Sequence, residues 1–180
     1  MNGIAKLAEQ PQVQMIDILA GYRVGEITRS LGNTYRERPG AQLRACFANM
    51  WDNELLRVYQ RKYYDRSEEY VKNAVKDSII KLLGPCTFEE TQDPAQVRVN
   101  NVTAAPVADY QIRITNQRIT YGYYRIDNCA FIVPLDMKRD QNPAPYAWVL
   151  ARESAPKAFE FYLQEYDRMF SEALSVYSRT

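Results

Sequence analysis

Runs of apolar residues divide the first part of the chain into predicted strands and a helix. Residues 13–20 (VQMIDILA) are nearly all apolar, which is typical of a central strand covered on both faces. After a turn at 36–40, residues 41–48 alternate between apolar and other positions, which predicts a second strand. Apolar positions at helical spacing in 22–31 predict a helix between the two. The three elements together indicate a right-handed parallel strand–helix–strand unit.

The next part of the chain, residues 54–84, is predicted to form two helices. Residues 54–64, rich in Leu, Tyr and basic side chains, are expected to form a helix. A second helix is predicted to begin at Asp65, as a cap whose third residue is Glu68, and to end at Gly84. Residues 88–107 are polar and irregular, and we expect a loop there with one edge strand.

The remainder of the chain is rich in β-branched and aromatic residues and closes with a helical pattern. Asn, Asp and Pro separate the apolar segments, which favours short antiparallel strands. The strands are predicted at 109–115, 119–126, 129–135 and 146–151. Ser154 is a candidate cap and Pro156 a first-turn residue for a long amphipathic helix whose aromatic stripe runs from Phe159 to Tyr177.

These elements predict one α/β domain: a mixed, partly parallel sheet flanked by helices, with a long C-terminal amphipathic helix. A chain of 180 residues suits one domain. We divide it into an N-terminal extension, residues 1–12, and a single α/β domain, residues 13–180.

Composition removes several kinds of chemistry. The chain has no histidine, although it has 14 tyrosines, so Ser-His-Asp and Cys-His catalysis and histidine metal sites are excluded. Its three cysteines (Cys46, Cys86 and Cys129) are widely spaced and are expected to be small buried apolar residues, with no metal site. No phosphate-loop or dinucleotide fingerprint occurs, and no cofactor is expected.

Charge and hydropathy restrict the partners and the compartment. The formal net charge is +1, so overall charge gives no field that would attract a polyanion. No apolar run approaches the ~20 residues of a membrane-spanning helix, and the first residues lack a signal-peptide pattern. We expect a cytoplasmic protein without a membrane span.

The order of elements, the segment 123–127 (YYRID) and the aromatic spacing of Tyr166 and Phe170 resemble a known family. Over residues 13–177 the chain resembles a phospholipase D-like domain, and more narrowly the degenerate, catalytically unassigned form attached to helix-turn-helix segments in bacterial regulators. No such segment is recognisable before residue 13, so direct DNA reading is not expected.

Active members of that family carry a motif of His, one residue, Lys, four residues and Asp, in which the histidine is the nucleophile. If Asp127 stands at the aspartate, Thr120 occupies the histidine position and Gly122 the lysine position. The resemblance therefore implies a retained scaffold without the family's phosphodiesterase activity.

Candidate ligand residues come from strand ends and from one strand. Ligands of α/β sheets usually bind beyond the carboxyl ends of parallel strands, and the polar side chains that follow the first two strands are Tyr22, Arg23, Asn49 and Asp52. They could hold a phosphorylated or nucleoside ligand by ion pairing and stacking. Arg125 and Asp127 are two residues apart and are expected on one face of a strand, where they pair with each other or flank a ligand.

A basic and aromatic segment, residues 57–66, is the candidate for nucleic acid. Its cations are Arg57, Arg61, Lys62 and Arg66. Such a composition suits a phosphate backbone with stacked bases, but it is more typical of a solvated helix face whose tyrosines lie against the core. Nucleic acid is therefore an unfavoured partner.

We conclude from the sequence that the chain is a non-catalytic, regulatory sensor or interaction domain. It would recognise a small anionic, nucleotide-like ligand or a protein partner, a second copy included. One alternative is a histidine-independent nucleotide-processing hydrolase or transferase that works through Asp52 or Asp127, and another is a nucleic-acid-binding module. Convergence of Asp52, Asp127 and Arg125 in one pocket would favour the enzyme.

Overall fold

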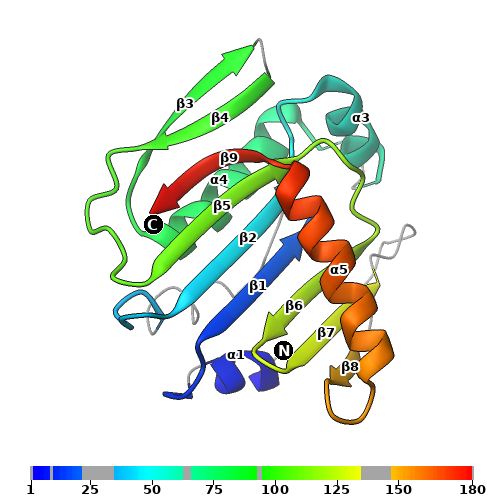
Figure 1. Ribbon diagram of the computed structural model, residues 1–180. Helices are drawn as coiled ribbons and strands as arrows, with labels where there is room; N and C mark the ends of the chain where they lie inside the picture. Colours follow the sequence, from blue (N-terminus) through cyan, green and yellow to red (C-terminus); the bar gives the residue numbers. More distant parts are fainter. Residues whose placement is uncertain are drawn as a thin grey trace.

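The computed structural model describes residues 2–8, 10–21, 35–62, 66–92, 95–134 and 147–179. The helix expected at 22–31, with Tyr22 and Arg23, lies outside these ranges. A mixed seven-stranded sheet has the order β8-β7-β6-β1-β2-β5-β9 (Figure 1). Its strands are β1 (Met15–Ala20), β2 (Gln42–Ala48), β5 (Asp109–Thr115), β6 (Tyr121–Ile126), β7 (Cys129–Pro134), β8 (Trp148–Ala151) and β9 (Leu174–Arg179).

The sheet is parallel in its centre and antiparallel toward its edges. β1 pairs in parallel with β2, and β2 with β5, whereas β6, β7, β8 and β9 are all added in antiparallel pairs. β1 is the fourth of the seven strands and is buried along nearly its whole length. This confirms the α/β class, the partly parallel sheet and the central position of the first strand.

Helices cover both faces of the sheet. The described helices are α1 (Asn2–Ala8), α3 (Asn53–Lys62), α4 (Glu68–Leu83) and α5 (Pro156–Glu172). Figure 1 shows α5 crossing in front of the sheet and α4 behind it, with α1 near the amino end of β1 and α3 beyond the carboxyl ends of the parallel strands. None of these helices is both long and apolar enough to cross a bilayer.

The ends of two helices differ from the prediction. Ser67, rather than Asp65, caps α4, because its Oγ accepts a hydrogen bond from the Tyr70 amide at 3.1 Å. α5 begins after Ala155 without a side-chain cap, and the hydroxyl of Ser154 donates instead to the carbonyl oxygen of Ala151 at 3.3 Å. The predicted stop at Gly84 is confirmed, since this residue is the C-cap of α4 with a φ of 82°.

Two segments were assigned to the wrong kind of element. Residues 174–179, predicted to continue the last helix to Tyr177, form β9 and cover the open edge of β5, with Val176 rather than Tyr177 buried. Within 88–107, predicted as a loop with one strand, β3 (Thr87–Gln92) and β4 (Ala95–Asn100) pair as a separate two-stranded sheet. In both cases backbone pairing with a neighbouring strand decides the conformation, and a short local pattern does not reveal that partner.

Residues outside the predicted domain also contribute to the core. Ile4 and Ala8 of α1 are buried in the same apolar cluster as the sheet. Of the cysteines, Cys46 is buried as expected and burial raises its pKa to about 12, while Cys86 and Cys129 are half-buried free thiols.

Candidate functional site

A buried ion-pair cluster lies in the middle of the sheet. Asp17 of β1 is fully buried and stands directly opposite Arg44 of β2 and Arg125 of β6 in the strand registers. Arg44 donates two hydrogen bonds to the Asp17 carboxylate, Nε to Oδ1 at 2.7 Å and Nη2 to Oδ2 at 2.9 Å. Arg125 Nε is an ion-pair contact at 2.6 Å from Oδ2, without hydrogen-bond alignment. Two cations thus compensate the one buried carboxylate.

Helix α5 closes this cluster from one face. The Tyr166 hydroxyl donates to the carbonyl oxygen of Arg44 at 2.7 Å, and the guanidinium of Arg44 lies 5.0 Å and 5.3 Å from the ring centroids of Tyr166 and Phe170. Asp167 Oδ1 contacts Arg44 Nη2 at 2.8 Å. Burial holds the pKa of Tyr166 well above its usual range. The cluster is therefore closely packed and ion-paired, and it docks the helix on the sheet.

Asp17 was not singled out from the sequence. The signal was present, because Asp17 is the only charged residue in the apolar run 13–20 and a charge in a central strand requires partners. Its partners could not be named without the strand registers. Arg44 and Arg125 are far from it in sequence and meet it only because β2 and β6 flank β1.

The predicted pairing of Arg125 with Asp127 does not form. Asp127 follows the end of β6 in the turn before β7, with a φ of 47°. Its Oδ1 accepts hydrogen bonds from the backbone amides of Met15 at 2.8 Å and Gln14 at 3.1 Å, which ties the turn to the start of β1. Residues two apart share a face only within a strand. Because β6 ends at Ile126, the Asp127 side chain is not held on the same face as Arg125.

The polar residues after β2 have structural partners. Asn49 is buried; its Oδ1 accepts from the Trp51 amide at 3.1 Å and its Nδ2 donates to Asn116 Oδ1 at 2.8 Å. Asp52 Oδ1 accepts from the Leu55 amide at 2.8 Å and so caps the start of α3. These side chains stand beyond the carboxyl end of β2, at the opposite end of the sheet from Asp127. Asp52, Asp127 and Arg125 therefore do not converge.

Helix α3 turns its arginines to solvent and a tyrosine to the core. Arg57 and Arg61 are exposed, whereas Tyr59 on the same helix is buried and burial raises its pKa to about 12. Arg66 is exposed, with its guanidinium 4.9 Å from the Tyr70 ring centroid. The side chain of Lys62 lies outside the described part of the structure. The favoured expectation, basic residues outside and a tyrosine against the core, is confirmed for Tyr59.

A small cleft opens at the carboxyl end of β1, beside the start of β6. Its volume is about 130 Å³. Thr120, aligned by sequence with the family's histidine, is exposed on its wall, and Gly122, aligned with the lysine, is buried outside the lining of the cleft. Two guanidinium groups and one carboxylate contribute charge, from Arg118, Arg168 and Glu165. Arg168 contacts Glu165 at 3.3 Å and Glu172 at 3.4 Å.

Over the described ranges, no group of three or more Cys, Asp or Glu side chains gathers as a metal site requires.

Comparisons with known proteins support the fold. No family model matches the chain, and no curated protein sequence matches it. The structure is similar to the crystal structure of Nuc, a phospholipase D family member from Salmonella typhimurium, with a TM-score of 0.51 and 10% identity over 97% of this chain and 88% of that chain. It is less similar to TrmBL2, an archaeal chromatin protein with a novel mode of DNA binding, with a TM-score of 0.48 and 9% identity over 97% of this chain and 49% of the other. The first similarity shows that the chain has a phospholipase D-like fold, and the second is too weak for inference.

Proposed function

We propose that this chain is a non-catalytic, regulatory sensor domain on a phospholipase D-like fold, which recognises a small anionic, nucleotide-like ligand at the cleft beside Thr120. The observation that carries the proposal is the side-chain content of that cleft. Thr120, aligned with the family's histidine, lines it together with two arginines, and Gly122, aligned with the lysine, has no side chain to reach it.

The absence of turnover follows from what these groups can do. A threonine hydroxyl is a weak nucleophile unless a base removes its proton, and the chain has no histidine. Glu165, the carboxylate on the cleft wall, contacts Arg168. Gly122 has no side chain to hold a phosphoryl oxygen, and the Asp127 carboxylate is hydrogen-bonded to backbone amides.

Anion recognition is favoured by charge and by size. Arg118 and Arg168 outnumber Glu165 among the residues that line the cleft, and the second carboxylate on Arg168, that of Glu172, lies outside the lining. Guanidinium groups bind phosphoryl oxygens through charge-assisted hydrogen bonds. A volume of 130 Å³ equals about four water molecules at their share of liquid volume. The cleft would thus admit one phosphoryl group, with the rest of a nucleotide outside it.

Calorimetric titration with inorganic phosphate and with adenosine monophosphate tests this proposal. Binding should weaken with added salt and with Arg118→Gln or Arg168→Gln, whereas Arg61→Gln, which removes an exposed cation on α3, should leave it unchanged. Equal affinities for all variants, or no binding at low salt, would contradict the proposed ligand class. Metal-independent hydrolysis of a phosphodiester that Asp127→Ala abolishes would contradict the non-catalytic role.

A protein partner is the second candidate. It is supported by large apolar side chains exposed on the edge strand β8 and on α5: Trp148 is 54%, Val149 59% and Phe161 59% exposed. A second copy could pair along β8, since an edge strand offers unpaired backbone groups. Native mass spectrometry of the protein and of Trp148→Lys tests this. A dimer that the substitution dissociates would support it, and a monomer in both samples would reject a homodimer. A cytoplasmic location remains part of the proposal.

A further inference from the structure

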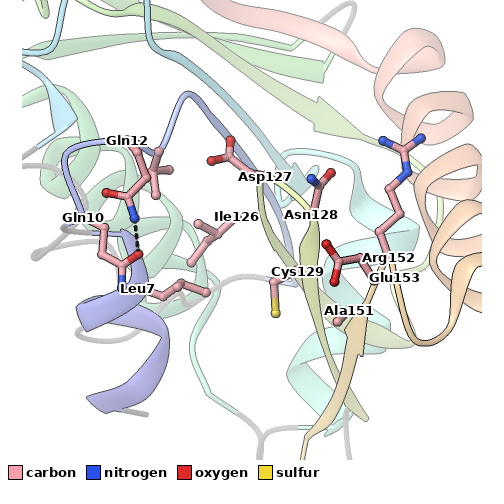
Figure 2. A pocket seen from close by; sticks show the side chains of 11 residues that line it. Leu7, Gln10, Gln12, Ile126, Asp127, Asn128, Cys129, Ala151, Arg152 and Glu153 are labelled. Atoms are coloured by element: carbon pink, nitrogen blue, oxygen red, sulfur yellow. Dashed lines mark hydrogen bonds between the residues drawn. The ribbon is translucent and has the colours of Figure 1, made fainter.

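A larger hollow lies at the other end of β1. Its volume is about 270 Å³. Figure 2 shows it between the segment that follows α1, with Gln10 and Gln12, and the turn that joins β6 to β7, with Asn128. No prediction from the sequence pointed to it, because it requires α1, the start of β1 and the end of β8 to come together.

The base of this pocket is apolar. Val13 and Ile126 are buried beneath it, and Leu7 and Ala151 line it as half-buried side chains. On one side Gln12 Nε2 donates to Gln10 Oε1 at 2.6 Å, so that these two amides bond to each other. An apolar base below a few polar groups is typical of a small-molecule site.

Three charged residues line the pocket, and their arrangement makes it acidic. Arg152 contacts Glu160 and lies 5.5 Å from the Phe159 ring centroid, and Figure 2 shows its guanidinium directed away from the hollow. Glu153 is exposed, its carboxylate lies toward the hollow in Figure 2, and it has no ion-pair partner among the residues that the structure describes. The Asp127 carboxylate, which accepts the backbone amides of Gln14 and Met15, adds a second negative charge.

We propose that this pocket binds a small organic cation, with an ammonium group near Glu153 and Asp127 and a short apolar body on the base formed by Val13 and Ile126. The charge of the lining selects a cation over an anion. The volume equals about nine water molecules at their share of liquid volume and lies just below the ~300–1,000 Å³ of sites for drug-sized ligands. The ligand is therefore of the size of a simple alkylamine.

Cys129 provides a direct readout, because its thiol lines the pocket. We would label the native protein with iodoacetamide at increasing concentrations of n-butylammonium, n-butanol or butyrate, which share an apolar body and differ in charge. Peptide mass spectrometry reads each cysteine separately. Burial raises the pKa of both Cys129 and Cys86, and Cys86 does not line the pocket, so it is an internal control.

Saturable protection of Cys129 by n-butylammonium, weaker protection by n-butanol and butyrate, and an unchanged Cys86 are the expected results. Glu153→Gln should weaken the protection about threefold to fivefold, the equivalent of one exposed ion pair of ~0.7–1 kcal/mol. Glu54→Gln, which removes an exposed carboxylate from α3, should leave it unchanged. Equal protection by all three compounds, protection that also reaches Cys86, or insensitivity to Glu153→Gln would overturn the proposal.

Discussion

The two ends of β1 carry hollows of opposite character. At the carboxyl end the cleft is about 130 Å³ and has two arginines and one glutamate. At the amino end the pocket is about 270 Å³ and is lined by two carboxylates and by one arginine whose guanidinium is directed away from it. A strand of six residues separates them by about 20 Å. The carboxyl end of the parallel strands, where α/β sheets usually bind ligands, therefore has the smaller of the two hollows. One fold can thus offer hollows of different charge at the two ends of the same strand.

The buried cluster around Asp17 makes this separation possible. It lies in the middle of β1 and holds β2 and β6 beside it, and β6 contributes to the walls at both ends, through Tyr121 at one and Ile126 at the other. Because α5 is docked on the same cluster through Arg44, the cleft residues Glu165 and Arg168 also depend on it. Changes to the cluster should affect both ends, and changes at either end should stay local.

The largest effect is expected for Asp17→Asn. The substitution removes a fully buried carboxylate from two half-buried guanidinium groups, and breaking a buried ion pair costs about 3–5 kcal/mol of unfolding free energy. Urea unfolding measures this. Asp167→Asn, which removes the half-exposed partner of the same Arg44, should cost only about 0–1 kcal/mol. Equal losses for the two variants would show that the cluster is not the shared centre.

A smaller and local effect is expected at the amino end for Asp127→Ala. Two backbone amides lose their acceptor, and alanine disfavours the φ of 47°, so the loss should be about 2–3 kcal/mol. Asp127→Asn keeps one carbonyl oxygen and tolerates positive φ, and should lose less. The measurement is urea unfolding of the three proteins side by side. If asparagine were as damaging as alanine, the negative charge rather than the hydrogen bonds would hold the turn.

The matching test at the carboxyl end uses glycines. A Cβ on Gly21 would meet Cε1 of the buried Tyr59 at 2.9 Å, so Gly21→Ala should overpack this end and cost about 1–3 kcal/mol. A Cβ on Gly122 would meet its nearest atom, on Tyr124, at 3.5 Å, an ordinary contact, and Gly122→Ala should be close to neutral. Thermal unfolding of both variants checks this, and destabilisation by Gly122→Ala alone would invert the expected order.

The parts of the fold that the sequence predicted are those with a strong local pattern. The apolar run before Gly21 and the periodic residues of α4 have only one favourable conformation, so both elements were found. β9 was mistaken for helix because Leu174 and Tyr177 continue the aromatic stripe of α5, although Ala173 is already extended, with a ψ of 151°. The edge of β5 that selects the strand is far away in sequence.

The candidate site was less predictable, for a related reason. Asn49 and Asp52 were placed correctly beyond a strand end, but whether such groups bind a ligand depends on the partners that they already have. Arg125 was expected to pair with Asp127 or to flank a ligand. Its partner is instead Asp17, the residue opposite it on β1. The amino-end pocket had no local signal at all, because its walls come from three separate segments of the chain, 7–13, 126–129 and 151–153.

The smallest effects come from two matched tyrosines, one at each end. Tyr35 and Tyr59 are both buried and donate to backbone carbonyls, of Gln42 at 3.1 Å and of Ile119 at 3.3 Å, so each Tyr→Phe change should cost about 0.5–1.5 kcal/mol near neutral pH.

Burial raises the pKa of Tyr59 from 10.0 to about 12, and burial with the nearby Asp127 charge raises the pKa of Tyr35 further. The folded state therefore keeps both protons while the unfolded chain releases them. Their stabilisation is present below about pH 10 and is lost as the pH rises through the folded-state pKa. The penalty of Tyr59→Phe in urea unfolding should shrink between about pH 10 and pH 12, and that of Tyr35→Phe should go on shrinking at higher pH. Penalties that stay constant across this range would show that neither phenol is shielded from solvent, and the two ends would then not differ in this respect.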